Sequence, residues 1–146
     1  MCIRDSFHCT QLALDSMLEN NWGRVVTIAS VASLRGFPYV SGYCASKHAV
    51  LGMTRALALE VATQGVTVNA VCPGYVDTDI VRTAIAGIVS KTGRTEADAM
   101  QHFTESNPQG RLVEVAEVAS AVSWLCSEGA AGVTGQAIAI DGGGTA

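Results

Sequence analysis

The chain has 146 residues, a formal net charge of −4 and a pI of about 5.2. Half of it is hydrophobic and only 15% is charged, which excludes a disordered chain and suits a single α/β domain with a real core. No basic stripe is present, so we expect no nucleic-acid partner. No apolar run reaches the ~20 residues of a membrane span, and the amino terminus lacks a signal-peptide pattern, so we expect a cytoplasmic protein without a membrane partner.

The cysteines give no sign of a disulfide framework or a metal site. They are odd in number and form neither a C-x-x-C pair nor a Cys/His cluster: Cys2, Cys9, Cys44, Cys72 and Cys126. Cys44 and Cys72 stand in apolar surroundings and are expected to act as small core residues. We therefore predict no metal ligands.

The first part of the chain predicts helix, strand and helix. Residues 1–6 show no useful pattern, and we expect them to be a non-native leader. Apolar residues at helical spacing predict an amphipathic helix over 7–20. Residues 25–29 are apolar and β-branched, which predicts a buried parallel strand. A loop then leads to a long helix over 43–64, which is rich in good helix formers.

The second part continues the alternation. An apolar strand is expected to stop at Pro73, and Asp77, Thr78 or Asp79 is expected to cap the helix that follows. The remaining predicted elements are strand 66–72, helices 80–89, 96–106 and 114–127, and strand 136–140. Strands that alternate with helices imply a parallel sheet with right-handed crossovers, and therefore an α/β fold.

Three polar side chains stand out around the first strand. Ser30 follows that strand, at the edge where ligands bind in open α/β sheets. Tyr43 and Lys47 are four residues apart, so they share one face of the next helix. Each residue alone has an ordinary explanation, since serines are common in turns and tyrosines and lysines are common on helices. The chain has only two lysines and three tyrosines, so their combination favours a proton-transfer site.

This arrangement resembles the carboxyl-terminal half of a classical short-chain dehydrogenase/reductase. In that family a serine follows the fifth strand, and Tyr-x-x-x-Lys begins thirteen residues later, as Tyr43 does after Ser30. The resemblance covers nearly everything from Phe7 onward. It continues through V-T-V-N-A-V-C-P-G-Y-V-D-T (66–78), G-R-L (110–112) and T-G-Q-A-I-A-I-D-G-G (134–143).

The resemblance implies an incomplete Rossmann-type, doubly wound parallel sheet, made of the last three strands with their helices. Residues 1–146 would form one partial domain, with 79–106 as a lid over the substrate. The implied reaction is hydride transfer between NAD or NADP and a ketone or secondary alcohol. The lid segment resembles that of enzymes acting on 3-oxoacyl and 3-hydroxyacyl compounds. The carboxylate pocket of 3-hydroxybutyrate dehydrogenases is expected to be absent, because Ala32 and Val40 replace its histidine and lysine.

The family's site residues carry over by position. Tyr43 would be the general acid and base, and Ser30 would orient the substrate oxygen. Lys47 would favour the phenolate form of Tyr43 and hold the nicotinamide ribose. The segment beside the nicotinamide would consist of Pro73, Gly74, Val76 and Thr78.

Other parts of the family pattern have no counterpart. No glycine-rich turn for a pyrophosphate lies between a strand and a helix. The asparagine of the family's proton relay would fall near Cys2 or Ile3, where none stands. We therefore expect a fragment that is inactive alone. When full length, the protein is expected to form a homodimer or homotetramer through the helices at 7–20 and 43–64. The alternative is a non-enzymatic, oligomer-forming fragment without a cofactor.

Overall fold

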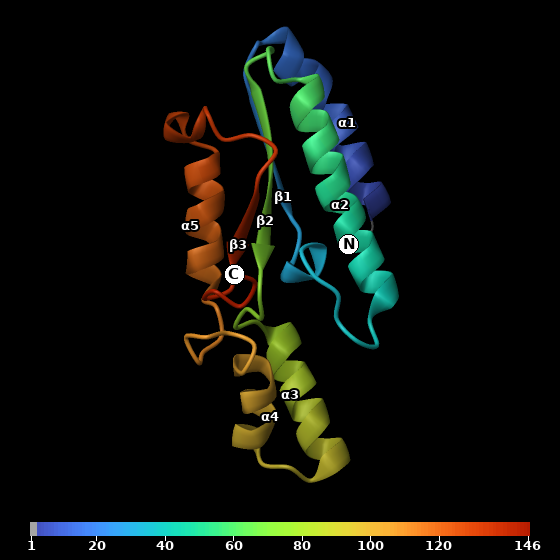
Figure 1. The fold of residues 1–146 in the computed structure, drawn as a ribbon, viewed down its shortest axis with the longest axis vertical. Helices are drawn as coiled ribbons and strands as arrows, with labels where there is room; N and C mark the ends of the chain where they lie inside the picture. The colour runs from blue at the N-terminus through green and yellow to red at the C-terminus, as the bar shows by residue number, and fades with distance from the viewer. Residues whose placement is uncertain (1–2) are drawn as a thin grey trace.

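Three parallel strands form the centre of the computed structural model, which describes residues 3–146. They are β1 (Gly23–Ile28), β2 (Val66–Pro73) and β3 (Ala137–Ile140), adjacent in that order. Helices α1 (Ile3–Glu19) and α2 (Ser41–Glu60) cover one face of the sheet, and α5 (Val115–Leu125) covers the other (Figure 1). The prediction of an α/β fold with three parallel strands is confirmed.

The register of the strands brings their carboxyl ends together. Ile28 lies opposite Val71, and Pro73 lies opposite Ile140. All of β2 is buried, as expected for the central strand of a covered parallel sheet. Its one amide, Asn69, donates to the carbonyl oxygen of Val133 at 2.8 Å and accepts from the backbone N–H of Gln136 at 3.0 Å. Asn69 therefore holds the loop before β3 against the sheet.

Several helix boundaries differ from the prediction, and the largest differences are at the start of α1 and the end of α2. Helix α1 begins at Ile3 rather than residue 7, and Ile3 packs against the apolar cluster under α2. Residues 3–6 of the expected leader therefore belong to this helix. Residues 1 and 2 lie outside the described residues, and so does Cys2, one of the two positions where the family's relay asparagine would fall. Helix α2 ends at Glu60 because the chain must turn sharply into β2. Gly65 makes that turn at φ +67°, where a Cβ would overlap the carbonyl oxygen of Asn21.

The remaining helices form a small separate layer below the carboxyl ends of the strands (Figure 1). Helix α3 (Asp79–Thr92) packs on α4 (Glu96–Thr104). Their shared cluster consists of Val81, Ile85, Ala99, Phe103 and Leu112. Thr78 takes the N-cap position of α3, as predicted, but its hydroxyl donates to the carbonyl oxygen of Val76 instead of capping the helix. The short 3-10 turns η1 (Val31–Ser33) and η2 (Glu128–Ala130) follow β1 and α5. No helix in the described part is long and apolar enough to cross a membrane.

Candidate active site

Ser30 lies directly after β1 and begins the turn η1. The backbone N–H of Ala29 still donates to the sheet, at 2.7 Å from the carbonyl oxygen of Val71. Ser30 is extended, and its Oγ accepts from the backbone N–H of Ala32 at 3.1 Å. Ser30 is therefore a turn-capping residue as well as a strand-end hydroxyl. Because its Oγ acts as an acceptor here, the hydroxyl proton can point to another group.

Tyr43 and Lys47 share one face of α2, as their spacing predicts, but their surroundings differ. The Lys47 side chain is buried, and its Nζ donates to the carbonyl oxygen of Ile28 at 3.2 Å. The same Nζ lies 5.7 Å from the centroid of the Tyr43 ring. Half of the Tyr43 surface is exposed. The arrangement therefore offers an accessible phenol backed by a buried ammonium.

A cavity of about 140 Å³ opens at the carboxyl ends of the strands. Three of the predicted site residues line it: Ser30, Tyr43 and Gly74. Lys47, Pro73, Val76 and Thr78 do not line it. The other lining residues are Val31, Ala32, Arg35, Phe37, Tyr75, Ser106, Asn107, Val113 and Asp141.

The segment after β2 is held by backbone contacts rather than by side chains. Gly74 donates its N–H to the carbonyl oxygen of Ile140 at 3.0 Å, and a Cβ on it would lie 3.2 Å from that of Asp141. Val113 lies opposite Val76. Its N–H donates to the carbonyl oxygen of Tyr75, and its carbonyl oxygen accepts from the N–H of Asp77, both at 2.9 Å. Backbone contacts thus fix residues 73–77 to β3 and to the segment around Val113.

Sequence reasoning missed two buried polar residues of the cavity wall. Asp141 accepts from the N–H of Gly143 at 3.0 Å and from the hydroxyl of Thr145 at 2.7 Å. Asn107 donates to the carbonyl oxygen of Arg111 at 2.8 Å and accepts from the N–H of Gln109 at 2.8 Å. Asp-Gly-Gly and Asn-Pro are ordinary turn sequences, so their pattern predicts turns and does not by itself indicate a site.

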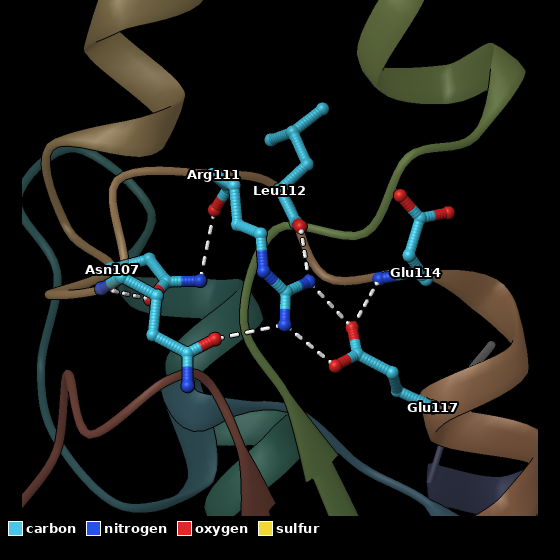
Figure 2. A network of polar contacts seen from close by, with 6 residues as sticks. Asn107, Arg111, Leu112, Glu114 and Glu117 are labelled. Carbon is cyan, nitrogen blue, oxygen red and sulfur yellow. Dashed lines mark hydrogen bonds and ion pairs between the residues drawn. The ribbon is translucent and has the colours of Figure 1, made fainter.

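The Asn107 loop is tied to α5 by an ion pair, shown in Figure 2. The Arg111 guanidinium donates to both carboxylate oxygens of Glu117, each at 2.7 Å, and Glu117 also accepts from the N–H of Glu114 at 2.7 Å. The hydrogen bonds from Arg111, and then from the Glu114 backbone, lower the pKa of Glu117 to about 2. The pair fixes the start of α5 relative to the cavity wall.

The expectation that Cys44 and Cys72 are core residues is confirmed, since both are buried. Cys72 belongs to the cluster of Ala29, Val50, Leu51 and Ala70 behind Ser30. Burial raises the pKa of its thiol, although Lys47 opposes this shift. Within residues 3–146, no group of three His, Cys, Asp or Glu side chains is placed to hold a metal ion.

Comparison with known proteins agrees with this geometry. The model of a family described as enoyl-(acyl carrier protein) reductase matches residues 3–145. The chain belongs to the short-chain dehydrogenase/reductase family.

Members of the short-chain dehydrogenase/reductase family match the chain over nearly all its length. A D-beta-hydroxybutyrate dehydrogenase of Rhizobium meliloti is 39% identical over 145 residues, which cover 99% of this chain and 56% of the relative. A 3-oxoacyl-[acyl-carrier-protein] reductase of Rickettsia felis is 34% identical over 141 residues, covering 97% of this chain and 54% of the relative. The chain spans about half the length of the curated relatives it matches.

A solved structure of an actinorhodin polyketide ketoreductase with NADPH aligns with a TM-score of 0.81 and 42% identity. The alignment covers 88% of this chain and 49% of the ketoreductase. The Rossmann-type fold expected from the sequence is therefore confirmed, and the chain corresponds to part of a short-chain dehydrogenase/reductase fold.

Proposed function

We propose that this chain carries the proton-transfer half of an NAD- or NADP-dependent oxidoreductase that interconverts ketones and secondary alcohols. The observation that carries the proposal is the cavity at the strand ends, where Ser30 and the accessible Tyr43 meet with the Lys47 ammonium buried behind the phenol. The names of the dehydrogenase, the 3-oxoacyl reductase and the ketoreductase that the chain is similar to support the same class of reaction.

Each of these three residues has a distinct role in the proposed proton transfer. Tyr43 gives its hydroxyl proton to the carbonyl oxygen in reduction and takes it back in oxidation. Ser30 directs its hydroxyl proton to the same oxygen, since its Oγ already accepts from Ala32. Lys47 uses one of its three N–H donors on Ile28, and its ammonium lies 5.7 Å from the centroid of the Tyr43 ring, so it holds a positive charge next to the proposed proton donor.

The cofactor would supply or accept the hydride at the carbon of the same carbonyl group. The residues that would hold it are Tyr43 and Lys47 at the ribose and Pro73, Gly74, Val76 and Thr78 beside the nicotinamide. Gly74 fits this role because it packs against Asp141 without a side chain that could block the cavity. The ketoreductase with NADPH supports the choice of a nicotinamide cofactor.

We propose 3-oxoacyl or 3-hydroxyacyl compounds as substrates, in keeping with the relatives' names. Residues 79–106 would act as the lid. Helices α3 and α4 pack on each other around an apolar cluster that also includes Leu112, just beyond the lid segment. Ser106, at the end of this segment, lines the cavity.

We also propose a homodimer or homotetramer formed through α1 and α2. A groove of about 310 Å³ runs between these helices, lined largely by Phe7, Leu14, Met53, Ala56 and Leu57. Phe7 and Leu12 are exposed on α1. Val50 of α2, and Val61 just after it, are buried in the core and do not contribute to this surface. The free thiols of the described cysteines support a cytoplasmic location.

The proposal is tested by comparing the 146-residue chain with the full-length protein encoded by its genomic reading frame. Oxidation of NADH and NADPH is followed with 3-oxoacyl thioesters and simple ketones. We expect turnover from the full-length protein and none from the chain alone, which has no pyrophosphate-binding turn. A full-length protein that forms oligomers but neither binds nor oxidises either cofactor would support the non-enzymatic alternative instead.

A further inference from the structure

Arg35 projects its charge toward the cavity from the loop between η1 and α2. Its guanidinium carbon lies 4.8 Å from the centroid of the Phe37 ring, and both side chains line the cavity with Ser30 and Tyr43. One guanidinium nitrogen, Nη1, donates to the carbonyl oxygen of Gly144 at 3.0 Å. The ring contact and the hydrogen bond together restrict the orientation of the guanidinium plane.

The charge of Arg35 is not neutralised by a carboxylate in the described part of the chain. Arg82 pairs with Asp77, and Arg111 pairs with Glu117, each through two hydrogen bonds. No such pair forms at Arg35 among residues 3–146. Arg35 is also the only cationic residue that lines the cavity within that part.

The other charged residue of the cavity wall, Asp141, does not form an ion pair with Arg35. The Asp141 carboxylate accepts from Gly143 and Thr145, and it is buried. A guanidinium has five N–H donors in a planar fork, and a single one of those at Arg35 has a backbone partner. The remaining donors suit an oxyanion, because carboxylate and phosphate groups match the fork with two parallel hydrogen bonds.

We propose that Arg35 binds the acidic group of the substrate, a carboxylate or a phosphate, and so selects anionic carbonyl compounds. This inference rests on the proposed function, because it assigns the substrate class of the same cavity. The substrate carbonyl would then lie at Ser30 and Tyr43, with its acidic group toward Phe37.

The test measures binding to the isotope-labelled 146-residue chain by NMR, without cofactor. Acetoacetate, the neutral ketone 2-butanone and inorganic phosphate are titrated separately into the parent chain, Arg35→Gln, Arg35→Lys and the control Arg94→Gln. Arg94 is an exposed arginine outside the cavity. Dispersed amide spectra establish that each variant is folded.

We expect acetoacetate to shift the amide signals of residues 30–37 and 144 with saturation. Arg35→Gln should weaken this binding about tenfold or more, the usual effect of losing a charge-assisted hydrogen bond. Arg35→Lys should recover part of it, while Arg94→Gln should match the parent. Binding of 2-butanone should not respond to Arg35→Gln. Stronger saturation by phosphate than by acetoacetate would identify a phosphate-bearing substrate, and the reverse a carboxylate.

Equal acetoacetate affinity in the parent and Arg35→Gln would overturn the proposal, as would the absence of saturable binding to the parent. The titration involves neither cofactor nor turnover, so its result is independent of the enzymatic assay. Arg35-dependent anion binding together with an inactive full-length protein would refute the proposed function alone. Turnover without Arg35-dependent binding would refute only the assignment of Arg35.

Discussion

The Lys47 ammonium donates to the carbonyl oxygen of Ile28 at 3.2 Å, and this contact joins α2 to the last residue of β1. Ile28 is two residues before Ser30, so the lysine positions the strand end that carries the serine. The same ammonium lies beside the Tyr43 ring. A residue expected from the sequence to act on the cofactor and the tyrosine therefore also has a structural role.

Lys47→Met should destabilise the fold because it leaves the Ile28 carbonyl oxygen without its donor. The expected loss is about 1–3 kcal/mol, the usual cost of an unsatisfied acceptor. Urea unfolding of the 146-residue chain measures it. The other lysine, Lys91, is exposed at the end of α3, so Lys91→Met should cost less than ~1 kcal/mol. Equal losses in the two variants would show that the buried contact adds nothing to stability.

Tyr43→Phe should reduce carbonyl reduction by the full-length protein by about 10²–10⁴-fold, because the ring remains while the proton donor is lost. Steady-state oxidation of the reduced cofactor gives the rate. The matched control is Tyr39→Phe, which removes a hydroxyl from a fully exposed tyrosine. A Tyr43→Phe enzyme within a few-fold of the parent rate would remove Tyr43 from the mechanism.

Protonation of Glu117 should make the fold less stable at acid pH than at neutral pH, because it breaks the ion pair with Arg111. Its pKa is about 2 in the folded chain, against an ordinary value of 4.5, because Arg111 and the Glu114 backbone bind the carboxylate. The stabilisation is therefore complete above pH 4.5 and is lost as the pH falls toward 2. Urea unfolding at several pH values should show a smaller loss over this interval for Glu117→Gln than for the parent.

The control for this experiment is Glu105→Gln, an exposed glutamate at the end of α4 that has no ion pair in the described part. Its pH dependence should follow that of the parent. Carbon NMR of the Glu117 carboxyl group gives a second, direct readout. A measured pKa of that group near the ordinary value of 4.5 would contradict the pairing with Arg111.

Gly142→Ala should destabilise the wall of the cavity. Gly142 has φ +64°, and a Cβ there would overlap the side-chain oxygen of Asn107. A loss of roughly 1–3 kcal/mol is expected from the combined backbone strain and displacement. Gly87→Ala, inside α3 with open space at its Cβ position, should instead stabilise by about 0.5–1 kcal/mol. In thermal unfolding, Gly142→Ala should lower the melting temperature and Gly87→Ala should raise it. An unchanged melting temperature for Gly142→Ala would contradict the prediction.

Ala56→Glu should weaken assembly of the full-length protein, because it puts a charge in the groove between α1 and α2. Leu57 is less suitable for this test, since it packs partly against the core. Ala84→Glu makes the same change at an exposed position of α3 and should leave the assembly intact. Sedimentation at micromolar concentration compares the two variants, and a parent protein that is already monomeric would rule out the proposed interface.

The strands could be predicted from the sequence because their signal is local. Three β-branched, apolar runs gave their positions to within two residues. The start of α1 and the end of α2 could not be predicted in this way, because they depend on contacts of Ile3 and Gly65 with residues far away in the sequence. Helical periodicity carries no record of such contacts, and the composition of α2 alone continues past its true end.

The cavity was predictable only where spacing along the chain brings residues together. Ser30 and Tyr43 lie on consecutive elements, so their meeting followed from the strand–loop–helix order. Asn107 and Asp141 come from turns far away in the sequence, and their buried side chains mainly satisfy backbone groups. Arg35 was missed because it stands in an irregular loop, where no periodicity indicates which way a side chain faces.

The cavity is built from residues that the ribosome produces at very different times. Ser30 and Tyr43 are made first, and Asp141 and the Gly144 carbonyl that holds Arg35 follow about a hundred residues after Tyr43. A nascent chain can therefore pair β1 with β2 while the pocket still lacks one wall. The side of the cavity that Asp141 lines is therefore completed only after residues 137–144 have been made and β3 can join the sheet.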